Sequence, residues 1–282
     1  MSKGMKVIIG SIATVAIVAA SASVGGRIVA ERRIEREIDD LFAASATAEQ
    51  VVITEADLKE LPEPVQRWLR YSGVVGKDRP AVVRLKQEGE LRLGDRGWFP
   101  FTAEEYYTTD PPGYVWSVKM EMAPLVYVVG RDAYIGGKGS MDMRLFGLVS
   151  VAKESGPDMD VGALLRYLNE IMWFPAAAIS PYITWEAIDT ESALATMSYG
   201  GVSASATFFF DEQGRLTNMT AERYDREDGK DNLWSTPLTD YGEFAGVRVP
   251  VEGEAVYARD TGDYPYIRLR ITEVEYDRPE RY

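Results

Sequence analysis

The chain has 282 residues, 46% of them hydrophobic and 27% charged, and a formal net charge of −13. This composition is typical of a globular protein with one large domain or two small ones. The acidic balance argues against nucleic acid as a partner, because a nucleic-acid surface needs clustered Lys and Arg. Cysteine and histidine are both absent, which excludes disulfides, thiol nucleophiles, Ser-His-Asp triads and metal centres built on His or Cys. Catalysis would have to use carboxylates, Lys, Tyr, Ser or a hard metal ion with oxygen ligands.

The N-terminal segment is apolar. Residues 7–26 carry no charge, and about 20 such residues let a helix cross the hydrocarbon core of a membrane. We therefore expect an N-terminal transmembrane helix that stays in the mature protein and anchors it. The alternative is a cleaved signal peptide, with Lys3 and Lys6 ahead of the apolar run and the small residues 20–22 as the cleavage site.

The residues after this run predict a short amphipathic stalk, because Ile34, Ile38, Leu41 and Phe42 recur at helical spacing. A solvated helical linker is the alternative. The chain is thus divided into an anchor and stalk over residues 1–43 and a single domain over residues 44–282. The charges that flank the apolar run slightly favour a cytoplasmic position for this domain. These charges are Lys3 and Lys6 on the N-terminal side, and Arg27, Arg32, Arg33 and Arg36 on the other.

Two short helices are predicted at the start of the domain. Thr54 and Asp57 have the spacing of a capping box for the first helix, and Pro62 and Pro64 stand where the second would begin. Gly73 is placed to end the second helix, because glycine readily adopts the left-handed conformation found there.

From residue 82 to 148 the sequence changes to short alternating runs separated by turn residues, and the same pattern resumes near residue 182. Tyr114, Trp116, Val118 and Met120 alternate with period two, which is typical of a strand with one buried face. The total is about ten strands, a number at which an open sheet curls, splits or closes. We predict an α+β fold in which a large, curved, half-barrel-like antiparallel sheet packs on a few helices. Turns are expected at residues 200–201, 211–214 and 260–263.

One helix interrupts the strands over about residues 160–173, and Pro175 is expected to end it. Further apolar residues widen its core-facing stripe near the C-terminal end, so we expect this helix to be buried on more than one side. The stripe consists of Val161, Leu164, Leu165, Leu168 and Met172, and it is widened by Tyr167, Ile171, Trp173 and Phe174.

Glu170 lies off this stripe, one turn after Arg166. The simplest interpretation is an i,i+4 ion pair, which contributes little stability if it is exposed. The functional interpretation is that the pair lines a cavity, where its polar groups orient a mostly apolar ligand. Burial of the pair decides between the two.

Other acidic and glycine-rich stretches give weaker signals. Glu104 and Glu105 are adjacent on a strand, so only one of them can point into a given site. Glu252 and Glu254 share a face, as glycosidase carboxylates do across their cleft, but a polar sheet face explains them equally well. The glycine-rich residues 130–139 lack the spacing of a phosphate-binding loop. We predict no metal ion and no cofactor.

Four segments together resemble a bacterial family catalogued only as a domain of unknown function (6544/6920 type). They are LPEPVQRWLRYSGVVG, TTDPPGYVW, MRLFGLVSVAKESGPDMDVGALLRYLNEIMWFP and YGEFAGVRVPVEGEAVY, and the likeness spans about residues 54–277. This family implies no activity and no catalytic residue. More distantly, the order of hairpins and helices resembles the lipoprotein-carrier fold, a curved sheet closed by helices around an apolar cavity for acyl chains.

These patterns and the carrier resemblance lead us to expect a membrane-tethered, non-enzymatic domain that binds a lipid or another hydrophobic molecule between sheet and helices. The resemblance also places the domain outside the cytoplasm. The alternatives are a carboxylate-based hydrolase of the cell envelope, and a structural or interaction domain with no small-molecule site. The candidate ligand-binding residues are Arg166, Tyr167, Glu170, Ile171, Trp173 and Phe174 of the helix, with Trp116 and Tyr127 among the strand aromatics.

Overall fold

An antiparallel sheet of fourteen strands makes up most of the described chain, which comprises residues 25–45 and 51–282 of the computed structural model. The strand order is β6-β5-β4-β3-β2-β1-β14-β13-β11-β10-β9-β8-β7, and β12 also pairs with β13. The strands are β1 (Val82–Arg92), β2 (Trp98–Thr109), β3 (Pro112–Ala123), β4 (Val126–Ile135), β5 (Lys138–Leu145), β6 (Val149–Ser155), β7 (Ile183–Ala187), β8 (Ser192–Tyr199), β9 (Val202–Phe210), β10 (Leu216–Asp225), β11 (Lys230–Ser235), β12 (Leu238–Phe244), β13 (Val247–Arg259) and β14 (Gly262–Tyr276).

The predicted class, a curved antiparallel half-barrel with few helices, is confirmed, but the prediction of about ten strands was too low. Sequence periodicity detects a strand by its buried face. Strands β6 and β12 contain no fully buried residue, and β11 is only six residues long. Strands β6 and β12 therefore lack the buried alternation that would have revealed them, and β11 is too short to give a clear periodic signal.

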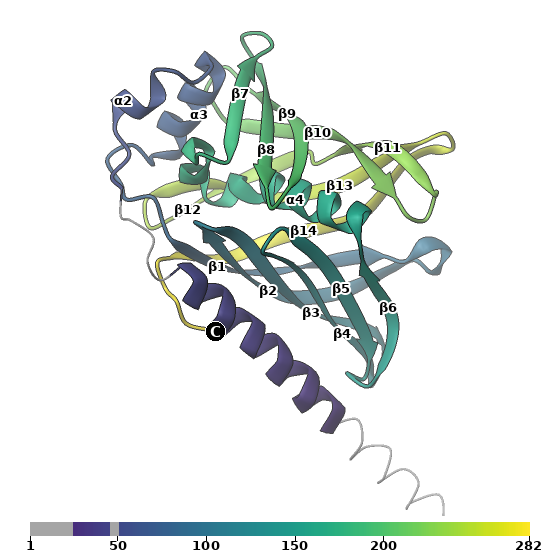
Figure 1. Cartoon of the computed structure of the whole chain (residues 1–282). Helices are drawn as coiled ribbons and strands as arrows, with labels where there is room; N and C mark the ends of the chain where they lie inside the picture. The colour runs from purple at the N-terminus through teal and green to yellow at the C-terminus, as the bar shows by residue number, and fades with distance from the viewer. Residues whose placement is uncertain (1–24, 46–50) are drawn as a thin grey trace, which may run out of the picture.

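The sheet curves around helix α4 (Pro157–Glu170). This helix packs against β4, β5 and β6 on one limb of the sheet and against β8, β9 and β10 on the other. Figure 1 shows it between the two limbs. On the β5 side the close approach needs Gly139, because a Cβ atom there would lie 2.2 Å from the carbonyl oxygen of Met159. The helix thus covers the concave face of the sheet.

Two glycine turns bring the limbs into contact at one end. Gly137 lies in the turn between β4 and β5, and Gly200 lies in the turn between β8 and β9. Both have positive φ, 79° and 62°, a conformation that glycine adopts without strain. A Cβ atom on Gly137 would lie 2.6 Å from the Cα atom of Gly200. The contact between the limbs is therefore one of backbone against backbone.

Residues 25–45 form a helix that packs along the outer face of the sheet (Figure 1). As predicted from their spacing, Ile34, Ile38, Leu41 and Phe42 form its buried side. Strand β2 is consequently covered on both faces, with Tyr107 in the main core and Tyr106 in the smaller core under this helix. The sheet residues of this smaller core are Val82, Tyr106, Val115, Val129 and Ala133.

The predicted transmembrane run, residues 7–26, falls almost wholly outside the described residues. Among residues 25–45 and 51–282, no helix is long and apolar enough to cross a membrane. The membrane anchor and the division of the chain at residue 43 stay predictions.

The two short helices before the sheet are confirmed as α2 (Glu55–Leu58) and α3 (Glu63–Ser72). The Thr54 backbone N–H donates to Asp57 Oδ2 at 2.7 Å, and Gly73 ends α3 with a φ of 76°. The buried side chain of Trp68 packs α3 onto the sheet. It contacts the rings of Trp185 in β7 and of Phe208 and Phe210 in β9.

The C-terminal end of α4 enters the core. The α-helix ends at Glu170, earlier than the predicted Trp173, and the chain continues as the 3₁₀ turns η2 (Ile171–Trp173) and η3 (Pro175–Ile179). Pro175 therefore begins a turn and does not terminate α4. The predicted stripe was also wrong at Val161, which is 42% exposed, because burial of that side begins one turn later with Ala163 and Leu164.

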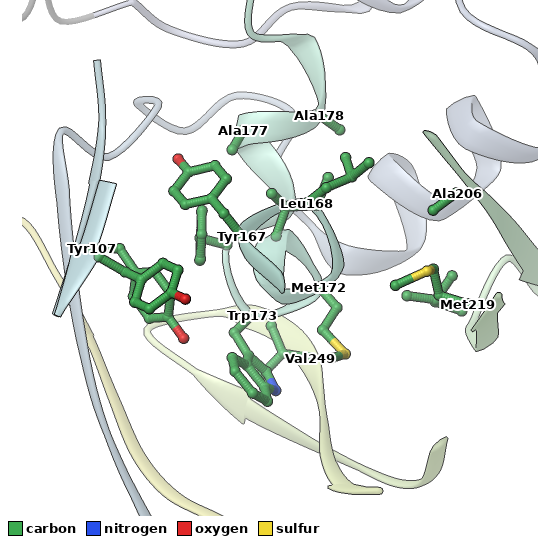
Figure 2. Close-up of a cluster of buried hydrophobic side chains, with 14 of the residues drawn as sticks. Tyr107, Tyr167, Leu168, Met172, Trp173, Ala177, Ala178, Ala206, Met219 and Val249 are labelled. Carbon is green, nitrogen blue, oxygen red and sulfur yellow. The ribbon is translucent and has the colours of Figure 1, made fainter. Parts of the chain in front are cut away.

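Figure 2 shows the packing at this end of α4. Leu168 and Met172 lie between Tyr107 of the first limb and Met219 of the second. Trp173 lies beside Val249 of β13, and its indole N–H donates to the carbonyl oxygen of Pro250 at 3.1 Å. The predicted position of Trp173 against the sheet is confirmed, since its side chain is buried between the helix end and β13.

We predict that Trp173→Ala lowers the free energy of unfolding by about 3–5 kcal/mol, because the truncation removes a buried indole and leaves a cavity. Urea denaturation followed by circular dichroism measures the change. The control is Leu125→Ala, whose side chain is 93% exposed and whose loss should change stability little. Equal stability of the two variants would contradict the packing described for Trp173.

Candidate ligand-binding site

A cavity of about 440 Å³ lies between the concave face of the sheet and α4. This volume is in the range of sites that bind small molecules, and the lining is mostly apolar, as in such sites. Because a Met side chain is flexible and polarizable, methionines let a cavity adapt to irregular apolar ligands. Five methionines of the described chain line this cavity, namely Met120, Met141, Met143, Met159 and Met172.

Helix α4 presents one stripe of residues to the cavity. Met159, Arg166, Asn169 and Glu170 lie in this lining and Trp173 continues it beyond the helix end. Their spacing of three, four or seven residues places them on one side of a helix. Leu164 and Leu168, on another side, are fully buried in the core. The helix therefore separates the packed core from the cavity.

The guanidinium of Arg166 binds three carboxylates from three elements. Its Nη2 donates to Glu105 of β2 at 2.7 Å, and its Nη1 donates to Asp132 of β4 at 2.8 Å. Its Nε donates to Glu170 of α4 at 2.7 Å. The Arg166 side chain is only 16% exposed, so the i,i+4 pair expected from sequence is part of a buried cluster that borders the cavity.

Neutral hydrogen-bond donors complete the cluster. The Gln87 amide donates to Glu105 Oε2 at 2.9 Å, and the Trp116 indole N–H donates to Gln87 Oε1 at 2.9 Å. The Tyr107 hydroxyl donates to Glu170 Oε2 at 3.2 Å. Both carboxylate oxygens of Glu105 and of Glu170 are therefore hydrogen-bonded, as buried polar groups must be.

Burial raises the pKa of Glu105 well above its ordinary value of 4.5, and the nearby charge of Glu170 acts in the same direction, while Arg166 opposes both. Burial also raises the pKa of Glu170, again against the guanidinium. Three carboxylates face one cation, and this excess of negative charge acts with burial to raise the pKa values of Glu105 and Glu170.

A second group of charged residues and tyrosines also lines the cavity. Arg259 of β13 donates to Asp225 at 2.7 Å and to Glu227 at 3.2 Å. The guanidinium of Arg259 lies 3.5 Å from the ring centre of Tyr264. A further arginine, Arg223 of β10, also lines the cavity.

Four of the eight residues predicted to bind a ligand line the cavity, namely Trp116, Arg166, Glu170 and Trp173. Tyr167, Ile171 and Phe174 lie in the core on other sides of the helix end. Tyr127 lies outside the concave face, where it packs against the core under the N-terminal helix and against the ring of Phe146. The eight residues thus fall into three separate environments.

Several residues of the site were missed from the sequence. The inward orientation of Glu105 could have been predicted. The residues two positions before and after it on β2, Ala103 and Tyr107, belong to the main core. Arg223 carries the same signal, since Met219 and Ala221 precede it on the buried face of β10. Gln87 and Asp132 carry this signal too, since Val83 and Leu85 precede Gln87 on the buried face of β1 and Tyr134 lies two residues after Asp132 on β4.

No arrangement typical of a metal centre accompanies these residues. The three carboxylates of the cluster surround the guanidinium of Arg166. Within residues 25–45 and 51–282, no group of three or more acidic side chains is arranged to hold a metal ion.

We predict that the protein loses stability as the pH rises above 4.5. In this range the raised pKa values of Glu105 and Glu170 make the folded protein bind more protons than the unfolded chain does. The free energy of unfolding therefore falls as the pH passes through the raised pKa values. Urea denaturation between about pH 5 and pH 8 measures this slope.

The variant Glu105→Gln keeps a neutral side chain of the same shape and should reduce the slope. The control is Glu186→Gln on the exposed face of β7, which should leave it unchanged. A slope that is the same in the wild type and in Glu105→Gln would contradict the raised pKa of Glu105.

A curved sheet wrapped around a helix, with an apolar cavity between them, defines this protein as a cavity-containing α+β half-barrel. Residues 51–269 match the model of the Family of unknown function (DUF6544), and the chain belongs to this family. The family likeness expected from the sequence is thereby confirmed. Comparison with curated proteins gives no match.

Two solved structures share part of this architecture. A LolA superfamily protein from Nitrosomonas europaea is 10% identical with a TM-score of 0.44, covering 75% of this chain and 93% of its own. A porin-like protein from Bacteroides uniformis is also 10% identical, with a TM-score of 0.27, covering 70% of this chain and 96% of its own. At TM-scores below 0.5, these likenesses carry no conclusion about the function of this chain.

Proposed function

We propose that this protein binds a lipid-like hydrophobic molecule in the cavity between the sheet and α4, without chemical conversion of that molecule. The observation that carries the proposal is the cavity itself: about 440 Å³ in volume, mostly apolar, and flanked by a few fixed polar groups. Burial of apolar ligand surface there would supply the binding free energy, at about 25 cal/mol per Å². The polar groups at its edge would orient the ligand.

The carboxylates near the cavity support binding over hydrolysis. A glycosidase needs two carboxyl groups that face the substrate from both sides of the scissile bond. Here both oxygens of Glu170 accept hydrogen bonds from Arg166 and Tyr107. Glu105, which shares Arg166 with Glu170, is fully buried. These acids stabilise each other's position through Arg166, which is the role expected of a buried ion cluster.

The test is displacement of a neutral fluorescent probe, N-phenylnaphthylamine, from the full chain in detergent-free nanodiscs. We expect saturable binding that dodecanol displaces. The variant Ala255→Phe places a ring in the cavity and should weaken binding by more than about tenfold, equivalent to ~1.4 kcal/mol. Ala152→Phe, from the opposite limb, should do the same.

The matched control is Ala258→Phe, three residues along β13 on the exposed face, which should bind as the wild type does. Probe binding that all three variants retain in full would place the bound molecule outside the cavity and contradict the proposal. Absence of binding to the wild type would favour a structural or interaction domain.

We also propose that residues 7–26 anchor the protein in a membrane and that the domain lies outside the cytoplasm. The uncharged run supports the anchor. A group of exposed apolar side chains at the start of the described helix, in two turns and in strand β6 agrees with a nearby bilayer, since such groups mark interaction surfaces. The turn at Gly147 contacts the backbone of Arg27. The group comprises Ile28, Val29, Leu125, Leu148, Val149 and Val151.

Reporter fusions at Tyr282 test this placement in cells. We expect alkaline phosphatase fused there to be active and a green fluorescent fusion to be dark, because each works on one side of the membrane only. The fusion protein should pellet with membranes at its full length. A fluorescent fusion would contradict the extracytoplasmic position, and a mature chain that begins near Ser23 would replace the anchor with a cleaved signal peptide.

A further inference from the structure

Arg223 lines the cavity without a carboxylate partner among the described residues. It lies on β10, and its guanidinium is stacked 4.6 Å from the ring centre of Trp234. Its Nη1 donates to the Tyr266 hydroxyl at 3.0 Å, and its Nη2 donates to the carbonyl oxygen of Gly162 on α4 at 3.5 Å. Both acceptors are neutral, while a guanidinium carries five N–H donors and a full positive charge.

Five of the six acidic residues that line the cavity are paired with other arginines, and the sixth, Glu254, lies at an exposed position of β13. Asp132 and Glu170 bind Arg166, and Asp225 and Glu227 bind Arg259. Glu252 pairs with Arg270. Within the described part of the chain, no carboxylate lies within ion-pair distance of Arg223. Arg166 is paired with three carboxylates, whereas Arg223 is paired with none of those described. The charge of Arg166 is therefore balanced by the protein, and the charge of Arg223 is not.

An arginine that is withdrawn from bulk water needs a counter-charge. Arginine stays protonated in proteins, so it cannot escape the cost of burial by losing its charge. Leaving a cation unpaired beside an apolar lining is unfavourable. The planar guanidinium offers two parallel N–H donors that fit a carboxylate or a phosphate, and such charged pairs are among the stronger hydrogen bonds.

We propose that the ligand of this cavity is an amphiphile with an anionic carboxylate or phosphate head, which binds Arg223, and an aliphatic tail, which lies along the methionine-lined part. This inference rests on the proposed function and adds the chemical class of the ligand. The stacked Trp234 and the hydrogen bond to Tyr266 hold the guanidinium in place for the head group. Met120 and Met143 line the apolar remainder of the cavity.

The experiment compares ligands of one chain length on the full chain, through their displacement of N-phenylnaphthylamine. Dodecanoate and dodecyl phosphate carry the anionic head, and dodecanol carries a neutral one. For the wild type we expect either anion to bind roughly tenfold more tightly than dodecanol, the gain expected from a charged hydrogen bond. This preference would oppose the net charge of −13, which by itself repels anions. The tighter of the two anions identifies whether the head is a carboxylate or a phosphate.

Arg223→Gln should abolish the preference while dodecanol binds as before, and Arg223→Lys should keep part of it. The matched control, Arg248→Gln, removes an exposed arginine that pairs with Glu243 outside the cavity, and should keep the full preference. Because Arg223 has only neutral partners in the structure, we expect Arg223→Gln to fold, and Arg223→Lys provides a second variant that retains the charge.

Equal binding of the anions and dodecanol to the wild type would overturn the anionic head group and leave the hydrophobic cavity in place. A preference that Arg223→Gln retains would likewise overturn the role of Arg223. Failure of every ligand, dodecanol included, to displace the probe would overturn the proposed function and this inference together.

Discussion

The contact of one guanidinium with three carboxylates fixes the relation between helix and sheet in this protein. Arg166 joins β2, β4 and α4 through Glu105, Asp132 and Glu170. Three buried carboxylates would repel one another, and they can approach because a cation with five donors lies between them. The cluster therefore sets how closely α4 approaches the first limb, and with it the floor of the cavity.

Arg166 and Arg223 both line the cavity, but within the described chain only Arg166 has carboxylate partners. Arg166 is surrounded by acids and stabilises the protein's own architecture. Arg223, on the opposite limb, is held by the aromatic groups of Trp234 and Tyr266. Aromatic contacts position a guanidinium without neutralising it, so the second limb keeps a positive charge directed at the apolar space. The two limbs thus differ in electrostatics although both are built from the same kind of hairpin.

Local features of this fold could be predicted from sequence, and contacts between distant segments could not. The alternation in Tyr114 and Trp116, and the helical spacing of Ile34 and Ile38, report burial directly, because each depends on a single element. Arg166 and Glu170 are one helical turn apart, so their pairing could also be predicted. Their burial depends on Glu105 and Asp132, which reach Arg166 only because the sheet curves around α4. Strands without a buried face, such as β6, leave no periodic signal at all.

The meeting of Gly137 and Gly200 sets a limit on the width of the protein at one end. The backbones touch there without strand pairing, and the Tyr134 hydroxyl donates to the carbonyl oxygen of Tyr199 beside this contact. A single methyl group on either residue would push the two limbs apart, because the backbone atoms opposite it cannot rotate away as a flexible side chain would. The spacing of the limbs at this end is therefore fixed by the smallness of two residues, neither of which touches the cavity.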